Sequence, residues 1–191
     1  MSELRRGILY TVVTMLLFGG AYHLFVWGVG RVVFPRQSEG SLLQRANGTI
    51  VGSSLLAQAF TRPEYFHPRP SGVDYNAAST GGTNYCPSNP DHLAAVAGRL
   101  AAIDSLEGVS PERVPSEMVT ASGAGLDPHI PPDGAEIQVA RVARARGMNP
   151  DRVRELVRAH TESPWLGIFG KARVNVLELN LALDANGRRT P

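Results

Sequence analysis

An uncharged N-terminal stretch constrains this chain more than any other feature. Arg5 and Arg6 precede residues 7–30, which hold no Asp, Glu, Lys or Arg. About 20 apolar residues at a helical rise of about 1.5 Å cross a hydrocarbon core of about 30 Å. The pattern divides the chain into a short segment at 1–7, a transmembrane helix at 8–30 and a soluble domain at 31–191.

A cleaved secretory signal is the main alternative to this anchor. Such a signal has a basic start, an apolar region of about 7–15 residues and a small-residue cleavage site. Arg5, Arg6 and the small residues at 28–30 fit loosely, but the apolar run is too long. We therefore expect an uncleaved, single-pass anchor.

The orientation of the anchor depends on the basic residues at its two ends. Arg5 and Arg6 on one flank equal Arg31 and Arg36 on the other. The positive-inside rule then favours a cytoplasmic N-terminus only through the free α-amino group.

His23 is an ionisable residue inside the predicted span. Such residues are candidates for function. The alternative, which we favour, is a neutral imidazole that bonds to a neighbouring helix or reaches toward the membrane surface.

Composition limits the function of the part after the anchor. The chain has 191 residues, is 43% hydrophobic and carries a formal net charge of +2, which fits one ordinary domain and no nucleic-acid partner. Cys86 is the one cysteine, so an intrachain disulfide and a tetrathiolate metal site are excluded. The histidines show no metal-ligand spacing, and we predict no metal.

Helix signals are clear in the second half of the chain. Asn-Pro-Asp at 89–91 and at 149–151 combines an N-cap, a proline at the first helical position and an acid at the positive helix end. Residues 134–146 are expected to form one helix that stops at Gly147. Residues 173–184 fit a strand or a helix capped by Asn175, and we favour the helix.

Other segments predict turns and irregular structure. Asn47-Gly48 indicates a tight hairpin turn. Residues 61–90 combine prolines, glycines and tyrosines without a period; a binding loop and a structural loop that folds its aromatics onto the core are both consistent with this. The mixture of elements predicts a compact α/β or α+β domain.

A group of arginines follows in residues 136–158. We expect a solvated helix face with ion pairs such as Glu155 with Arg158, and the alternative is a docking face for an acidic partner. The arginines are Arg141, Arg144, Arg146, Arg152, Arg154 and Arg158.

The motifs of nucleotide-driven catalysis are missing from the sequence. Gly170-Lys171 lacks the other residues of a phosphate-binding P-loop, and the Asp-Lys-Thr-Gly of an aspartyl-phosphate pump does not occur. Ser122, Asp127 and His129 lie close together, which leaves open a serine hydrolase that uses Ser122 and His129. Residues this close rarely align as a triad, and there is no nucleophile-elbow motif, so we favour a glycine-rich turn.

Several segments, in order along the chain, resemble one family, the C chain of the potassium-transporting Kdp P-type ATPase. The similarity runs from the anchor to about residue 184. The segments are residues 52–60 (GSSLLAQAF), 65–71 (YFHPRPS), 114–115 (VP) with 120–130 (TASGAGLDPHI), 138–143 (QVARVA) and 174–183 (VNVLELNLAL).

The resemblance implies a non-catalytic, single-pass subunit of the plasma (inner) membrane, with a cytoplasmic N-terminus and an extracytoplasmic domain. Its implied partners are membrane lipid, the potassium-channel-like Kdp A subunit and the ATP-hydrolysing Kdp B subunit. The family is described as a nucleotide-binding catalytic chaperone that raises the affinity of the pump for ATP. ATP is the substrate of the complex, and no cofactor is bound by motifs of this chain. Because a domain outside the cell cannot touch cytoplasmic ATP, we expect an indirect coupling between states.

We predict that Ser122, Asp127 and Gln138 are functionally sensitive positions. The other hypotheses are the anchored hydrolase and an anchored module that binds a small ligand.

Overall fold

The computed structural model describes residues 2–45 and 47–187, and the chain divides into two units, Met1–Leu43 and Gln44–Pro191. The first unit is mainly one helical segment, Glu3–Val33, whose mean hydropathy over its most apolar window is 1.7. Among the described residues it is the one helix that is long and apolar enough to cross a membrane, as expected. Its parts, with the short helix after it, are α1 (Glu3–Thr14), η1 (Met15–Ala21), α2 (Tyr22–Val33) and α3 (Pro35–Ser38).

A wide turn in the middle of this segment gives His23 a partner. The turns of η1 are π-helical, with hydrogen bonds that span five residues. His23 Nδ1 lies 2.7 Å from the carbonyl oxygen of Phe18, five residues earlier. Because a carbonyl oxygen only accepts, Nδ1 carries the hydrogen. The imidazole therefore bonds within its own helix, and its role toward a neighbouring helix stays a prediction.

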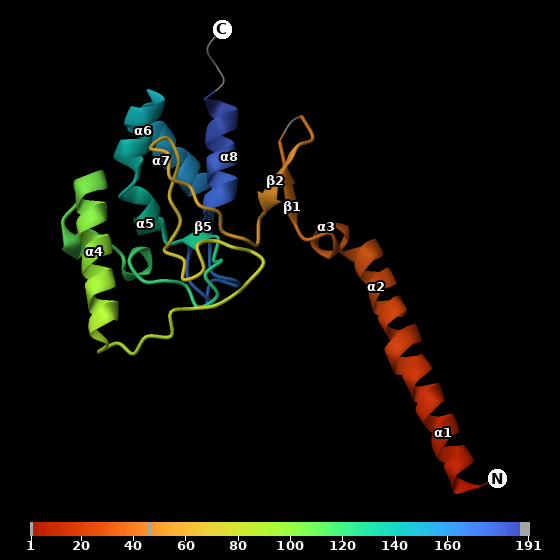
Figure 1. Ribbon diagram of the computed structural model, residues 1–191. Coiled ribbons are helices and arrows are strands. Elements are labelled where there is room, and N and C mark those ends of the chain that lie inside the picture. Colours follow the sequence, from red (N-terminus) through yellow and green to blue (C-terminus); the bar gives the residue numbers. More distant parts are fainter. Residues whose placement is uncertain (1, 46, 188–191) are drawn as a thin grey trace. The chain divides into compact units, whose positions relative to one another are not determined.

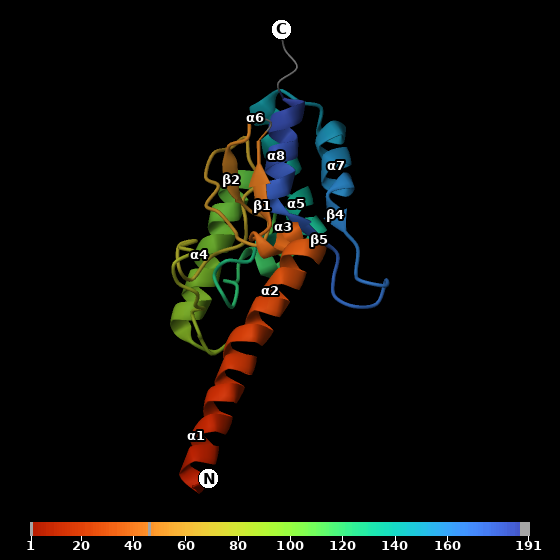
Figure 2. The ribbon, with the colours of Figure 1, turned by 90° about the vertical axis from the view of Figure 1, so that its right-hand side faces the viewer.

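A three-stranded antiparallel sheet lies at the centre of the second unit, which we call the head. Its strands are β3 (His129–Ile130), β5 (Arg173–Asn175) and β4 (Thr161–Glu162), in the order β3-β5-β4. Val174 of β5 pairs with Ile130 on one side and Thr161 on the other. Helices α5 to α8 gather on one side of this sheet (Figures 1 and 2). Antiparallel pairing places the mixed fold in the α+β class.

The remaining elements include the predicted hairpin and the helices expected after Asn89 and Asn149. The hairpin predicted around Asn47-Gly48 is confirmed as a two-stranded sheet. The elements are β1 (Leu42–Gln44), β2 (Ile50–Ser53), α4 (Pro90–Glu107), η2 (Pro111–Arg113), η3 (Ser116–Met118), α5 (Pro132–Glu136), α6 (Val139–Arg146), α7 (Pro150–Ala159) and α8 (Val176–Asn186).

The asparagine caps are confirmed. The side chains of Asn89 and Asn149 accept hydrogen bonds of 2.8 Å from the backbone N–H groups two residues later. Asn175 accepts from the N–H of Glu178 at 3.1 Å and begins α8. The ambiguous segment at 173–184 is therefore a short strand followed by the favoured helix.

The single helix predicted over residues 134–146 is wrong, because Ile137 and Gln138 separate α5 from α6. The side-chain Nε2 of Gln138 donates to the carbonyl oxygen of Gly134 at 3.0 Å. The backbone N–H of Gln138 bonds to Ala135 at 3.0 Å instead, in the tighter i−3 pattern. The amide side chain thus takes the carbonyl that an uninterrupted helix would use. The predicted stop at Gly147 is confirmed, with a left-handed φ of 62°.

The arginine group is not one solvated face. Arg141 is buried and Arg146 is partly buried, with side chains exposed by 4% and 10%. The expected partner of Glu155 is also different, since Glu155 pairs with Arg152 at 2.7 Å. The prediction is wrong for these positions because two of the arginines bond to carbonyl groups of a distant segment, described below.

The core of the head lies between the sheet and α5 to α8. Its buried residues are Phe66, Met118, Ile130, Ala135, Val139, Val142, Ala143, Val153, Leu156, Val157, Val174, Val176, Leu179 and Leu183. Phe66 is the one member that belongs to the irregular stretch between β2 and α4.

Candidate functional site

Two buried amide side chains hold that irregular stretch against the helices. Asn180 of α8 accepts from the N–H of Phe66 at 2.9 Å and donates to its carbonyl oxygen at 3.0 Å. Gln138 does the same for His67, at 2.7 Å and 3.2 Å. Each amide thus bonds to a residue of the stretch as a neighbouring β-strand would. Residues 63–67, which we call the clamped segment, are joined to the core through these side chains.

Two arginines bond to the remaining carbonyl groups of the clamped segment. Arg141 Nη1 donates to the carbonyl oxygens of Pro63 and Tyr65 at 2.6 and 2.8 Å. Arg146 Nε donates to the carbonyl oxygen of Glu64 at 2.6 Å. Every carbonyl oxygen of the clamped segment therefore accepts a hydrogen bond from a side chain. Buried backbone groups need such partners, and helices or sheets usually supply them.

A buried ion pair supports Arg141. Its Nε donates to Oε1 of Glu107 at 2.8 Å, and the Glu107 side chain is exposed by only 3%. Burial raises the pKa of Glu107, and the adjacent Arg141 opposes that rise. Removing one member of such a pair leaves an uncompensated buried charge, which is strongly destabilising.

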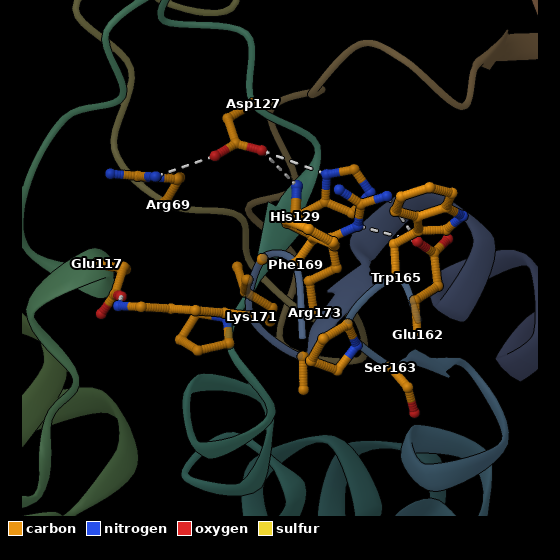
Figure 3. A pocket seen from close by; sticks show the side chains of 15 residues that line it. Arg69, Glu117, Asp127, His129, Glu162, Ser163, Trp165, Phe169, Lys171 and Arg173 are labelled. Atoms are coloured by element: carbon orange, nitrogen blue, oxygen red, sulfur yellow. Dashed lines mark hydrogen bonds and ion pairs between the residues drawn. The ribbon is translucent and has the colours of Figure 1, made fainter. Parts of the chain in front are cut away.

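A cavity of about 460 Å³ lies elsewhere in the head, beside β3 and β5. Asp127 is at its edge (Figure 3). Its Oδ2 accepts from Arg69 Nη1 at 2.9 Å, and its Oδ1 accepts from the backbone N–H of His129 at 3.0 Å. The same Oδ1 lies 3.4 Å from Nδ1 of the His129 ring.

These contacts keep Asp127 ionised. Burial by itself raises the pKa of Asp127, but hydrogen bonds from the side chain and backbone of His129 outweigh this, with further help from Arg69. The net result is a pKa of about 2 for the Asp127 carboxyl. A carboxylate that accepts several hydrogen bonds is typically held in its charged form. Asp127 thus fixes the turn before β3 and is a poor proton donor near neutral pH.

The other charges around the cavity are paired too. Lys171 lies 3.2 Å from Glu117, and Arg173 lies 2.9 Å from Glu162 (Figure 3). The three acids that line the cavity therefore each have a cationic partner. Such a charge-matched cavity has no surplus of positive charge for a triphosphate. Among residues 2–45 and 47–187 there is no group of three His, Cys, Asp or Glu that could hold a metal.

Ser122 is buried but stands apart from this arrangement. Its Oγ is one of three buried side-chain atoms without a hydrogen-bond partner in the described part of the chain. It does not line the cavity, whereas His129 does. The structure therefore brings Asp127 and His129 together but forms no bond between Ser122 and a base, as a serine nucleophile requires.

The structure places the three predicted positions in three different environments. Asp127 lines the cavity, Gln138 bonds to the clamped segment, and Ser122 is a buried side chain in the glycine-rich turn. Their functional sensitivity stays a prediction. Sequence reasoning missed Arg69 and Asn180. Both lie in segments that carry the family resemblance, at 65–71 and 174–183, which was the available signal.

The structure thus places the chain in the class of proteins that combine one candidate membrane helix with one α+β head. The comparison with known families then identifies it, since residues 4–185 match the family described as the C chain of the K+-transporting ATPase. The chain belongs to this family.

Curated relatives agree with the family match. A protein of Polaromonas naphthalenivorans is 50% identical over 185 residues, which are 95% of this chain and 94% of the relative. A protein of Xanthomonas oryzae pv. oryzae is 47% identical, with 97% and 88% covered, and one of Geobacter sulfurreducens is 46% identical, with 96% and 98% covered. Each is named potassium-transporting ATPase KdpC subunit. The similarity thus covers nearly the full length of both partners in each comparison.

Proposed function

We propose that this chain is the non-catalytic accessory subunit of an ATP-driven potassium uptake complex. It joins the potassium-channel-like subunit and the ATP-hydrolysing subunit and stabilises their assembly. The observation that carries this proposal is the match of residues 4–185, because it includes both the apolar helix and the head. A relative that shared only the head would leave the membrane attachment without support.

The chain influences ATP use without contacting ATP. The paired charges of the 460 Å³ cavity and the absence of a P-loop sequence both argue against a triphosphate site. The family role of raising ATP affinity then requires coupling: the subunit binds one state of the pump more tightly, and that state binds ATP more tightly. By reciprocity, ATP strengthens the binding of this subunit to the pump.

Deleting the chain from the assembled pump tests the proposal. We expect loss of potassium-stimulated ATPase activity or dissociation of the complex, and expression of the chain from a second plasmid should restore both. A pump that keeps full activity and composition without this chain would contradict the assignment. In the intact complex, a photoreactive ATP analogue should label the hydrolysing subunit and leave this chain unlabelled.

The predicted sensitive positions provide a finer test. Ser122→Ala, Asp127→Ala and Gln138→Ala should each reduce growth at low potassium while the complex still assembles. Wild-type growth of all three variants would refute their importance.

We place the head on the extracytoplasmic side of the inner membrane. Cys86 makes this testable, because it is exposed and is the one thiol of the chain. Hydrogen bonding with Ser88 lowers the pKa of the Cys86 thiol, which favours the reactive thiolate. A membrane-impermeant maleimide should label Cys86 in intact cells, and Cys86→Ser is the control. Labelling only after cell lysis would place the head in the cytoplasm.

A further inference from the structure

The segment between β4 and β5 presents an unusual apolar surface. Residues 163–170 (SPWLGIFG), which we call the finger, extend from the sheet as a narrow loop (Figure 2). Trp165, Leu166, Ile168 and Phe169 are exposed by 70%, 69%, 77% and 60%. Single exposed apolar residues are normal on a protein surface, but a contiguous group marks an interaction site.

Four backbone hydrogen bonds close within the finger. Trp165 and Phe169 exchange N–H···O bonds of 2.9 and 3.0 Å. The N–H groups of Gly167 and Ile168 bond to Pro164 and Trp165 at 2.9 and 3.1 Å. An unbonded N–H is expensive in an apolar medium, so these four bonds lower the cost of moving the tip out of bulk water.

The turn at the tip holds the apolar side chains outward. Leu166 and Gly167 have φ angles of 52° and 74°, both in the left-handed region. Two such residues in succession are typical of a tight hairpin turn. A leucine in this conformation is strained, and strain of this kind is concentrated at functional sites.

The finger is uncharged, and charged residues lie only at its base. None occurs in residues 163–170. At the base, Glu162 pairs with Arg173 at 2.9 Å, and Lys171 pairs with Glu117 at 3.2 Å. The Lys171 side chain is 87% exposed, so this ion pair lies at the surface, outside the finger. The tip can therefore move out of water without the cost of dehydrating a charged side chain.

We propose that the finger inserts into the interfacial region of the lipid bilayer. The inference rests on the membrane attachment in the proposed function. The connector from the end of α2 to the head is residues 34–43, which reach about 27 Å with the 4 residues of α3 helical and the others extended. This tether keeps a bilayer within constant reach of the head and gives it a high effective concentration. Trp and Phe are suited to the boundary between water and hydrocarbon.

The intrinsic tryptophans make insertion measurable in the full chain. Trp27→Phe leaves Trp165 as the one tryptophan. This variant is reconstituted into phosphatidylcholine vesicles with or without lipids brominated on the acyl chain near the headgroup. We expect bromolipid to reduce Trp165 emission by about half, as for an indole at the interface. Unchanged emission would overturn the proposal.

Two further variants control for the position of the apolar residues. Leu166→Ser with Ile168→Ser, in the Trp27→Phe background, should abolish the bromolipid quenching. Leu55→Ser removes a similarly exposed leucine, 62% exposed, outside the finger and should leave quenching intact. Equal quenching in both variants would contradict a role for the finger.

The same samples separate this inference from the membrane attachment. Extraction with alkaline carbonate reports on the helix alone. A chain that resists extraction but shows no quenching contradicts the finger proposal and leaves the anchor standing, whereas a chain that is extracted contradicts the anchor. If bromolipid does not quench Trp165, and Trp165 emission changes only when the other pump subunits are added, the result would overturn lipid insertion in favour of a protein partner.

Discussion

The clamped segment and the finger are both irregular and aromatic, yet their aromatic side chains have opposite environments. Phe66 of the clamped segment is fully buried, whereas Trp165 and Phe169 of the finger are mostly exposed. The clamped segment bonds to side chains of distant helices, and the finger bonds to itself. Absence of regular structure therefore does not distinguish a core element from an interaction element; the source of the backbone's partners does.

Phe66→Ala should have the largest effect on this contrast. Truncating a fully buried phenylalanine leaves a cavity and lowers the free energy of unfolding by about 3–5 kcal/mol. Urea unfolding of the full chain in detergent micelles, followed by circular dichroism, measures the change. Phe169→Ala in the finger is the matched control, with an expected change below about 0.5 kcal/mol. Similar losses for both would remove the distinction between the segments.

Asn180→Leu tests the side-chain bonds that hold the clamped segment. The substitution keeps the approximate volume but orphans the N–H and carbonyl of buried Phe66, so we expect a loss of about 2–4 kcal/mol. Asn186→Leu is the control on the same helix, because that side chain is exposed and its two bonds, to the carbonyl oxygen of Ala182 at 2.8 Å and from Arg152 Nη2 at 3.4 Å, lie at the surface. A loss no larger than that of the control would show that the clamp is not needed for stability.

Asp127→Asn should have a smaller, pH-dependent effect. The pKa of Asp127 is lowered from 3.8 to about 2, so its stabilising effect is complete above pH 4 and disappears as the pH falls through 2. Because the side chain is one-third exposed, we expect a loss of only about 1 kcal/mol at pH 7. Unfolding at pH 7 and pH 2 checks this, with exposed Asp104→Asn as the control. A difference from wild type that persists at pH 2 would contradict the electrostatic explanation.

The double substitution Leu166→Ser with Ile168→Ser should have the smallest effect on stability. Neither side chain packs into the core, so the free energy of unfolding should change by less than about 0.5 kcal/mol. The same urea titration measures it. A loss of several kcal/mol would mean that the finger is a structural element after all.

Local signals in the sequence predicted much of the fold. The helix starts at 89–91 and 149–151 and the cap at Asn175 depend on residues within one turn of each other, and all three are confirmed. The membrane helix likewise follows from one continuous apolar run. Both kinds of signal depend only on residues that are close together in the sequence.

The contacts that build the candidate site could not be predicted in this way. Asn180 and Phe66 lie 114 positions apart, and Gln138 and His67 lie 71 apart. An amide side chain has no preferred partner at such distances, so its role depends on the tertiary fold. The same reason explains the break between α5 and α6 and the burial of Arg141, which local helix periodicity assigned to a continuous, solvated helix.

Hydrogen exchange at single amides tests the division of the head most directly. The N–H groups of Phe66 and His67 donate to the buried Asn180 and Gln138 side chains, and their exchange can be measured in the full chain in micelles. We predict that both exchange only when the head unfolds globally, at the rate of core amides such as that of Leu179. Exchange of Phe66 and His67 as fast as that of the exposed loop residue Tyr85 would show that the clamped segment opens locally, and would contradict the account.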